Sequence, residues 1–255
     1  MAFSKTYDGD LPQRINKWLA QAGVCSRREA EGLIAQGLIT IDGEIVTDAG
    51  RKIATGQTLV LADGVSLQLD RQISVLVHKP MGYVSAQPEP GQIPAARLLT
   101  RANLAGGVGE IPASDCSLAP LGRLDQDSRG LLLLSQDGAL AKAVIGPQSA
   151  LDKEYSVRVA GRLTEAKLAL LRHGLELDGR QLKPAIVEVL PDERVRFVLF
   201  EGRNRQIRRM CEAVGLVVTD LLRTRIGPLH LAPLEEGRWR PLTPEERAAL
   251  LAAAV

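Results

Sequence analysis

The sequence predicts an α+β fold in two parts, a small α-α-β domain over residues 11–70 and a larger domain over residues 73–255. Three observations lead to this prediction. Two short helical patterns precede a β-hairpin signal near the start of the chain. A polar stretch, ADGVSLQLDRQ, separates them from the rest of the chain. Beyond it, predicted strands outnumber helices without strict β-α alternation, which argues against a doubly wound parallel sheet.

The small domain begins with two predicted helices. In RINKWLAQAG, apolar residues recur at helical spacing, and Gly23 provides a C-terminal stop. In SRREAEGLIAQG, Ser26 and Glu29 form an S-x-x-E capping box, so a second helix is expected to begin there. LITIDGEIV then alternates apolar residues around Asp42 and Gly43, a strong hairpin signal, and TLVLAD supplies a further strand.

The larger domain opens with the strand SVLVHKP, which its proline closes. Residues 86–120 are rich in Pro, Gly and Ala and predict a long surface excursion with a helix only around residues 95–101. The remaining predicted elements are the strands LLLLS, KEYSVRVA, IVEVL, RVRFVLFEG and LVVTDLLRTRIGPLHL, and helices near residues 138–145, 164–174 and 204–215. TPEERAALL closes the chain as a helix with Thr243 as N-cap and Glu246 at position N3.

Composition is that of an ordinary globular protein, with 45% hydrophobic and 24% charged residues. The 3% aromatic share argues against recognition by rows of stacked aromatics. A net charge of +2 is too small to indicate nucleic acid by itself, so the placement of charge must decide. The three cysteines show no disulfide or zinc-ligand spacing, which fits a reducing cytosol. No leader peptide or membrane span is expected.

The first candidate binding surface is basic. Arg14 and Lys17 belong to the opening helix, and Arg27 and Arg28 fall in the first turn of the next. Cations at a helix N-terminus oppose the helix dipole, so a phosphate held between the helix amides and these side chains would stabilise them. The alternative interpretation is a solvated face whose charge neighbouring glutamates cancel.

The stretch GRLDQDSRG places two acids and two arginines ahead of the apolar run LLLL. Asp125, Asp127 and Gly130 match positions 1, 3 and 6 of an EF-hand loop, but Arg129 stands at position 5 and no acid stands at position 12. Calcium binding is therefore disfavoured. An acidic turn that caps a strand is the plain structural interpretation, which Arg123 and Arg129 weaken because both can reach phosphate.

A second basic cluster lies in and just before the helix of EGRNRQIRRM. Its members are Arg196, Arg203, Arg205, Arg208 and Arg209. On a helical wheel, Arg208 lies at the edge of the apolar face, whereas Arg205 and Arg209 point together toward solvent or a polyanion. A buried Arg208 would need a carboxylate partner, and the alternative is a snorkelling side chain with its charge in water.

Other candidate chemistry is weaker. Tyr155 shares a strand face with Val157, which is typical of a core tyrosine. His78, His173 and His230 have no GxSxG or comparable motif beside them, so a hydrolase triad has no support. The glycine run GGVGE lacks the flanking elements of a dinucleotide site.

Four segments together resemble the motifs of the RsuA-type family of ribosomal RNA pseudouridine synthases: HKPMG, GRLDQDSRGLLLLSQDG, KEYSV and GRNRQIRRM. The resemblance covers residues 13–250, and its first part is similar to an S-four-type RNA-binding domain. It implies a catalytic domain built on a large mixed, mainly antiparallel sheet flanked by helices. The chain departs from the common family pattern at His78, at the hairpin residues Asp42 and Gly43, and in the length of the 86–120 excursion.

Position by position, the resemblance implies the site residues. Asp125 matches the essential aspartate, Tyr155 the tyrosine that packs on the target base, and Arg208 the basic residue that pairs with the aspartate. Arg123 matches an arginine that fills the space left by the flipped base. Arg208 would thereby gain the carboxylate that its place on the wheel requires. Contact with RNA is also expected of Arg129.

The reaction implied is the isomerisation of uridine to pseudouridine, which conserves atoms and needs no redox cofactor, metal or ATP. Asp125 could act as a nucleophile or as a base that removes a sugar proton, and the sequence leaves both roles open. The implied partner is ribosomal RNA, free or in an assembling particle, and the implied protein is a cytoplasmic monomer. The segments SRREAEGLIAQG, NRQIRRMCE and RTRI are more similar to RluF-like members, which act on large-subunit RNA, and this resemblance favours that substrate. The alternatives are a small-subunit RNA enzyme and a non-catalytic RNA-binding assembly factor.

Overall fold

The computed structural model describes residues 3–254 except 23, 26, 64, 66–71, 108, 114, 115 and 117. The chain divides into two compact units, residues 1–74 with 135–142, and residues 75–134 with 143–255. Each unit has its own hydrophobic core. The fold class predicted from the sequence, α+β, is confirmed by the element order and by the mixed sheets.

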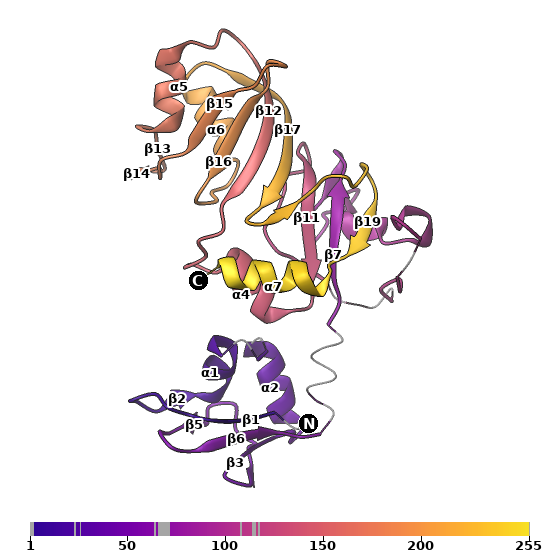
Figure 1. Ribbon diagram of the computed structural model, residues 1–255, viewed down its shortest axis with the longest axis vertical. Helices are drawn as coiled ribbons and strands as arrows, with labels where there is room; N and C mark the ends of the chain where they lie inside the picture. Colours follow the sequence, from indigo (N-terminus) through magenta and orange to yellow (C-terminus); the bar gives the residue numbers. More distant parts are fainter. Residues whose placement is uncertain are drawn as a thin grey trace. The chain divides into compact units, whose positions relative to one another are not determined.

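The N-terminal unit packs two helices against short strands. Its elements are β1 (Ser4–Thr6), β2 (Gln13–Arg14), α1 (Ile15–Gln21), α2 (Arg27–Ala35), β3 (Ile39–Ile41), β4 (Glu44–Ile45), β5 (Lys52–Ile53) and β6 (Thr58–Leu61). Four strands form an antiparallel sheet in the order β1-β6-β3-β4, and β2 pairs with β5. Both helices send apolar side chains into one core, which includes Trp18 of α1 and Ile34 of α2. Figure 1 labels the two helices and most of these strands.

The hairpin predicted at Asp42 and Gly43 is present in this unit. Asp42 and Gly43 both adopt positive φ, 50° and 86°, which a tight two-residue hairpin loop demands. The Asp42 carboxylate also accepts a 2.8 Å hydrogen bond from the Thr58 amide and so ties the hairpin to β6. Gly23 and Ser26, the predicted helix stop and N-cap, lie outside the described residues.

The second unit is built on a nine-stranded sheet. Its main path is β15 (Ile186–Val189), β16 (Val195–Leu199), β12 (Lys153–Ala160), β17 (Val217–Ile226), β11 (Arg129–Ser135), β7 (Ser74–Lys79) and β19 (Trp239–Pro241). β10 (Ala119–Pro120) and β18 (Leu229–His230) pair with β11 and β17. β11 and β17 run parallel, whereas β15, β16, β12 and β17 are antiparallel neighbours. The sheet is therefore mixed and mainly antiparallel, as the family resemblance implied.

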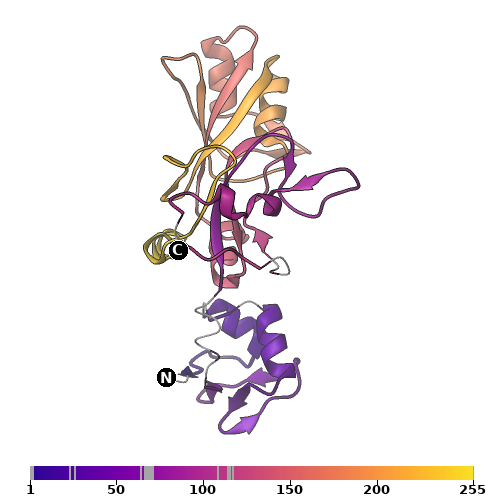
Figure 2. The ribbon, with the colours of Figure 1, turned by 90° about the vertical axis from the view of Figure 1, so that its right-hand side faces the viewer.

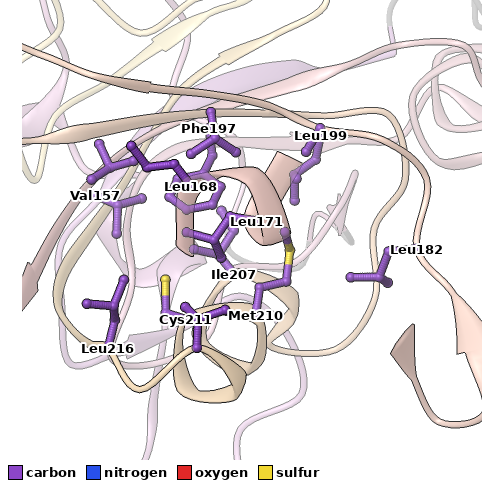
Figure 3. Close-up of a cluster of buried hydrophobic side chains, with 14 of the residues drawn as sticks. Val157, Leu168, Leu171, Leu182, Phe197, Leu199, Ile207, Met210, Cys211 and Leu216 are labelled. Carbon is purple, nitrogen blue, oxygen red and sulfur yellow. The ribbon is translucent and has the colours of Figure 1, made fainter. Parts of the chain in front are cut away.

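Two helices cover one face of this sheet. α5 (Glu165–Arg172) and α6 (Gln206–Ala213) join β12, β15 and β16 in a single core. Figure 3 shows Leu168 and Leu171 of α5 facing Ile207, Met210 and Cys211 of α6 across this cluster. The core fixes α6 against the sheet, and the arginines of the GRNRQIRRM motif lie in α6 and in the segment that leads into it. Figure 2 shows the same elements from the side.

Two further helices complete the chain. α4 (Gly138–Ile145) follows β11, and α7 (Pro244–Ala253) ends the fold. α7 begins with the predicted capping box, because the Thr243 hydroxyl accepts a hydrogen bond from the Glu246 amide and the Glu246 carboxylate accepts one from the Thr243 amide. None of the helices in the described part of the chain is long and apolar enough to cross a membrane.

The 86–120 segment differs from its predicted form. The expected helix is a pair of short 3-10 turns, η1 (Ala95–Leu98) and η2 (Arg101–Asn103), and a small parallel pair links β8 (Tyr83–Val84) to β9 (Ile93–Pro94). The segment is not wholly a surface excursion either. Trp239 is fully buried and donates from its indole to the Thr100 carbonyl at 2.8 Å. The Trp239 indole thus holds part of this segment against the domain, a contact that the composition of residues 86–120 cannot predict.

Candidate active site

A pocket of about 480 Å³ opens in the second unit. The loop before β11, the segment after α4, β12, the stretch from β16 into α6, and β17 all contribute to its wall. Asp125, Tyr155 and Arg208, the three residues predicted to carry the chemistry, all line it. Residues far apart in the sequence therefore meet in one cavity.

The loop that carries Asp125 is held by its backbone. The Ser85 hydroxyl donates to the Leu124 carbonyl at 2.7 Å and accepts from the Leu124 amide at 2.8 Å. The Gly82 amide donates to the Gln126 carbonyl at 2.8 Å. The backbone on both sides of Asp125 is thus fixed by residues 82 and 85, at and just after the end of HKPMG, while the Asp125 side chain stays 34% exposed.

Arg205 is the cation nearest to Asp125. Its Nη1 lies 3.4 Å from Asp125 Oδ2, and its guanidinium also donates to both carboxylate oxygens of Asp127, at 3.1 and 2.9 Å. The helical wheel turned Arg205 with Arg209 toward solvent or a polyanion; in the structure Arg205 is exposed but lies against Asp125 and Asp127. α6 begins only at Gln206, and Arg205 is its N-cap in the left-handed conformation, with φ 50° and ψ 33°. This backbone turns the side chain into the pocket instead of along the helix.

Arg208 does not form the expected ion pair with Asp125 within the described residues. Its Nη2 donates to the Asp127 carbonyl at 2.7 Å, its Nε lies 3.3 Å from Asp127 Oδ2, and its Nη1 donates to the Val218 carbonyl at 3.3 Å. The carboxylate that satisfies this half-buried cation is Asp127, two residues beyond the predicted partner. Arg205 binds the same carboxylate and holds the pKa of Asp127 below its ordinary value.

Tyr155 links the pocket to the core. It is half-buried, packs against the cluster of Figure 3 and lies opposite Phe197 on one side and Arg223 on the other. Tyr155 therefore contacts the core, as its strand pattern predicted, and it also lines the pocket.

Arg223 was not predicted. Its side chain is 1% exposed, and its guanidinium donates to the carbonyls of Leu131 at 2.7 Å, Gly122 at 3.1 Å and Arg123 at 3.4 Å. Burial lowers the pKa of Arg223, and contact with the Tyr155 side chain opposes this shift. A buried cation that holds three carbonyls fixes the segment before Asp125. The segment RTRIG reads only as strand, and nothing in its pattern shows which arginine turns inward.

Lys79, from HKPMG, is a second buried cation that sequence reasoning passed over. It is fully buried and donates to the carbonyls of Pro80 and Tyr83 at 3.0 and 2.7 Å. Burial lowers the pKa of Lys79 to about 8, while the negative charges of Asp125 and Asp127 act in the opposite direction. Its place at the end of the apolar strand SVLVHKP was the available signal that it is buried.

The predicted RNA-binding residues fall into two groups. Arg14, Lys17, Arg27 and Arg123 are exposed, and no ion pair of the described residues engages them. Arg129, Arg205 and Arg209 are instead paired with acids of this chain. Arg129 binds Asp220 and Glu236, and Arg209 binds Asp178 through both nitrogens at 2.9 and 2.6 Å. The side chain of Arg28 lies outside the described residues.

The acids and histidines of the described residues do not gather into a group of three or more that could hold a metal ion. His78 is buried, with Nδ1 2.8 Å from the Leu234 carbonyl, and burial lowers its pKa. Two carboxylates line the pocket: Glu201 is paired with Arg203, and Asp125 lies 3.4 Å from Arg205 with Tyr155 in the same lining.

Two family models match the chain. Residues 73–213 match the RNA pseudouridylate synthase model, and residues 13–59 match the S4 domain. The chain belongs to the RNA pseudouridylate synthase family. The resemblance to RsuA-type enzymes with an S-four-type domain is thereby confirmed, and the enzyme class is RNA pseudouridine synthase.

Curated relatives and a solved structure agree with this family. Ribosomal large subunit pseudouridine synthase B of Bacillus subtilis is 35% identical over 249 residues, covering 95% of this chain and 97% of that protein. The dual-specificity RNA pseudouridine synthase RluF of Salmonella typhi is 33% identical over 245 residues, covering 93% of this chain and 78% of that protein. A crystal structure of a pseudouridylate synthase matches with a TM-score of 0.64 at 29% identity, covering 93% of this chain and 99% of that one.

Proposed function

We propose that this pseudouridine synthase isomerises a uridine of large-subunit ribosomal RNA, with Asp125 as the reacting carboxylate. The observation that carries the proposal is that Asp125 stands partly exposed in a pocket that also contains Tyr155 and several cations. The relative from Bacillus subtilis, named for the large ribosomal subunit, supports the choice of RNA.

In this reaction the bond between the sugar C1′ and the base N1 breaks, the base turns, and C1′ bonds to C5. The proton of C5 is released and N1 gains one, so atoms balance without a cofactor. Asp125 acts either as a nucleophile or as the base that removes a sugar proton. In both roles it must be ionised, and the Arg205 guanidinium 3.4 Å away stabilises that charge.

The other pocket residues hold the substrate. The target base must leave its stack, at a cost of a few kcal/mol. We assign Tyr155 to packing on the extruded base. We assign Arg123, which is exposed and lacks an ion pair within the described chain, to the space that the base leaves or to its phosphate. Arg208 becomes a positioning residue, because it holds the Asp127 carbonyl next to the reacting loop.

The domain roles follow the same division. We propose that residues 11–70 bind RNA through Arg14, Lys17, Arg27 and Arg28, and that residues 73–255 carry out catalysis. We further propose that the enzyme acts as a monomer, that its substrate is ribosomal RNA within an assembling particle, and that it works in the cytoplasm, where ribosomal RNA is assembled.

Asp125→Asn tests the assignment, because the amide keeps the shape of the side chain and removes its charge. We expect no tritium release from large-subunit RNA labelled at uridine carbon-5, with RNA affinity within about twofold of wild type. Asp192→Asn, an exposed aspartate outside the pocket, is the matched control and should turn over normally. Substantial tritium release by Asp125→Asn would overturn the assignment, and normal ribosome assembly with this variant would favour a non-catalytic assembly factor.

A further inference from the structure

One rim of the pocket carries an aromatic ring that the fold does not use. The chain has two Trp, three Tyr and three Phe, all within the described part, and Phe200 alone among them is exposed, at 41%. It follows β16 directly, whereas its neighbour Leu199 belongs to the hydrophobic core. A single exposed Phe is ordinary on a protein surface. This one, however, lines the same pocket as Asp125 and Tyr155.

A cation lines the same part of the pocket. The Lys183 amide donates to Glu201 Oε1 at 2.9 Å, which places Lys183 next to the residue that follows Phe200. The Lys183 side chain is exposed and lines the pocket as well. No ion pair or side-chain hydrogen bond that the structure describes engages its ammonium group. Neighbouring Arg203, by contrast, is bound to Glu201 and to the carbonyl of Leu177.

An exposed aromatic ring and an unpaired cation in one pocket wall can together bind a single nucleotide. A base of any identity can stack on a phenyl ring, and its phosphate can bind an ammonium group. Glu201, the acid of this rim, is itself occupied by Arg203 and by the Lys183 amide, so it does not neutralise the Lys183 side chain.

We propose that Phe200 and Lys183 form a subsite for the nucleotide adjacent to the target uridine. The inference rests on the proposed function, because it takes the target base to lie beside Asp125 and Tyr155. Extrusion of that base leaves a face of the neighbouring base without its stacking partner. The Phe200 ring replaces the lost partner at the pocket rim, and Lys183 holds the phosphate of the same nucleotide.

Steady-state kinetics provide the first test. With a large-subunit RNA transcript, Phe200→Ala should raise KM at least about fivefold, the lower end of what a stacked base contributes, with kcat within about twofold. Phe200→Tyr should restore KM. Ile186→Ala removes an apolar side chain of equal exposure, 41%, that does not line the pocket, and should change nothing. Lys183→Ala should lower the slope of log affinity against log salt by about 0.7, whereas Phe200→Ala should leave the slope unchanged.

A local fluorescence signal provides the second test and does not depend on turnover. F200W places an indole at the rim, while the native Trp18 and Trp239 are 6% and 0% exposed. A short oligouridylate should quench F200W emission and should not quench V217W, which reports from an exposed position outside the pocket. Equal responses of the two variants, or an unchanged KM for Phe200→Ala, would overturn the subsite. If wild type releases no tritium while F200W is still quenched, the proposed reaction fails and the RNA subsite stands.

Discussion

Gly130→Ala tests how the start of β11, directly after the loop that carries Asp125, is held against β17. Gly130 pairs with Arg223 where β11 runs parallel to β17. A Cβ on Gly130 would lie 2.4 Å from the Arg223 carbonyl oxygen and 2.6 Å from its nitrogen, so ordinary contact at 3.4 Å requires the two strands to part by about 1 Å. The φ of Gly130, +115°, adds strain of roughly 1–3 kcal/mol, and overpacking of this kind costs about 1–3 kcal/mol more.

We therefore expect Gly130→Ala to lower the free energy of unfolding by about 4 kcal/mol. Gly237→Ala is the matched control, because its φ is +81° but nothing lies within 4 Å of its Cβ. It should cost only about 1 kcal/mol. Urea unfolding in a Trp18→Phe background follows Trp239 alone and thus reports on the second unit. Equal losses for the two variants would refute the close-contact argument.

Two further predictions concern charge. Arg205→Gln removes the cation nearest Asp125, so it should lower kcat about 10- to 100-fold in the tritium-release assay. The free energy of unfolding in urea should change by less than about 1 kcal/mol, because the ion pair is partly exposed. An unchanged kcat would show that Arg205 does not act in the site. Lys79 is neutral in the folded chain and charged in the unfolded chain between its lowered pKa of about 8 and its ordinary pKa of 10.5. The free energy of unfolding should therefore gain up to about 3 kcal/mol relative to Lys79→Met as pH rises through this window, and parallel pH profiles of the two proteins would contradict the shift.

Much of the fold follows from local sequence chemistry. The alternation in KEYSVRVA marks β12, and the Thr243 capping box marks the start of α7. Asp125, Tyr155 and Arg208 were recognised from motifs and do line one pocket, because the strands and the helix that carry them share a core.

What the sequence could not predict depends on backbone geometry and on distant partners. The wheel treats Arg205 as helical, but one left-handed residue redirects its side chain toward Asp125. Arg223 and Arg225 are two residues apart and would share a face of a regular strand, but a register shift between β12 and β17 separates them. Arg223 is then buried and bound to carbonyls, whereas Arg225 binds Asp152. The burial of Trp239 likewise depends on a loop far away in the chain.

Arg223 holds the loop before Asp125 through backbone atoms, so side chains of that loop stay available for other contacts. Its acceptors there are the carbonyls of Gly122 and Arg123, so the Arg123 side chain takes no part in the attachment. Substitutions at position 123 therefore leave this backbone attachment of the Asp125 loop in place. The proposed RNA contact of Arg123 can thus be altered separately from the attachment of this loop.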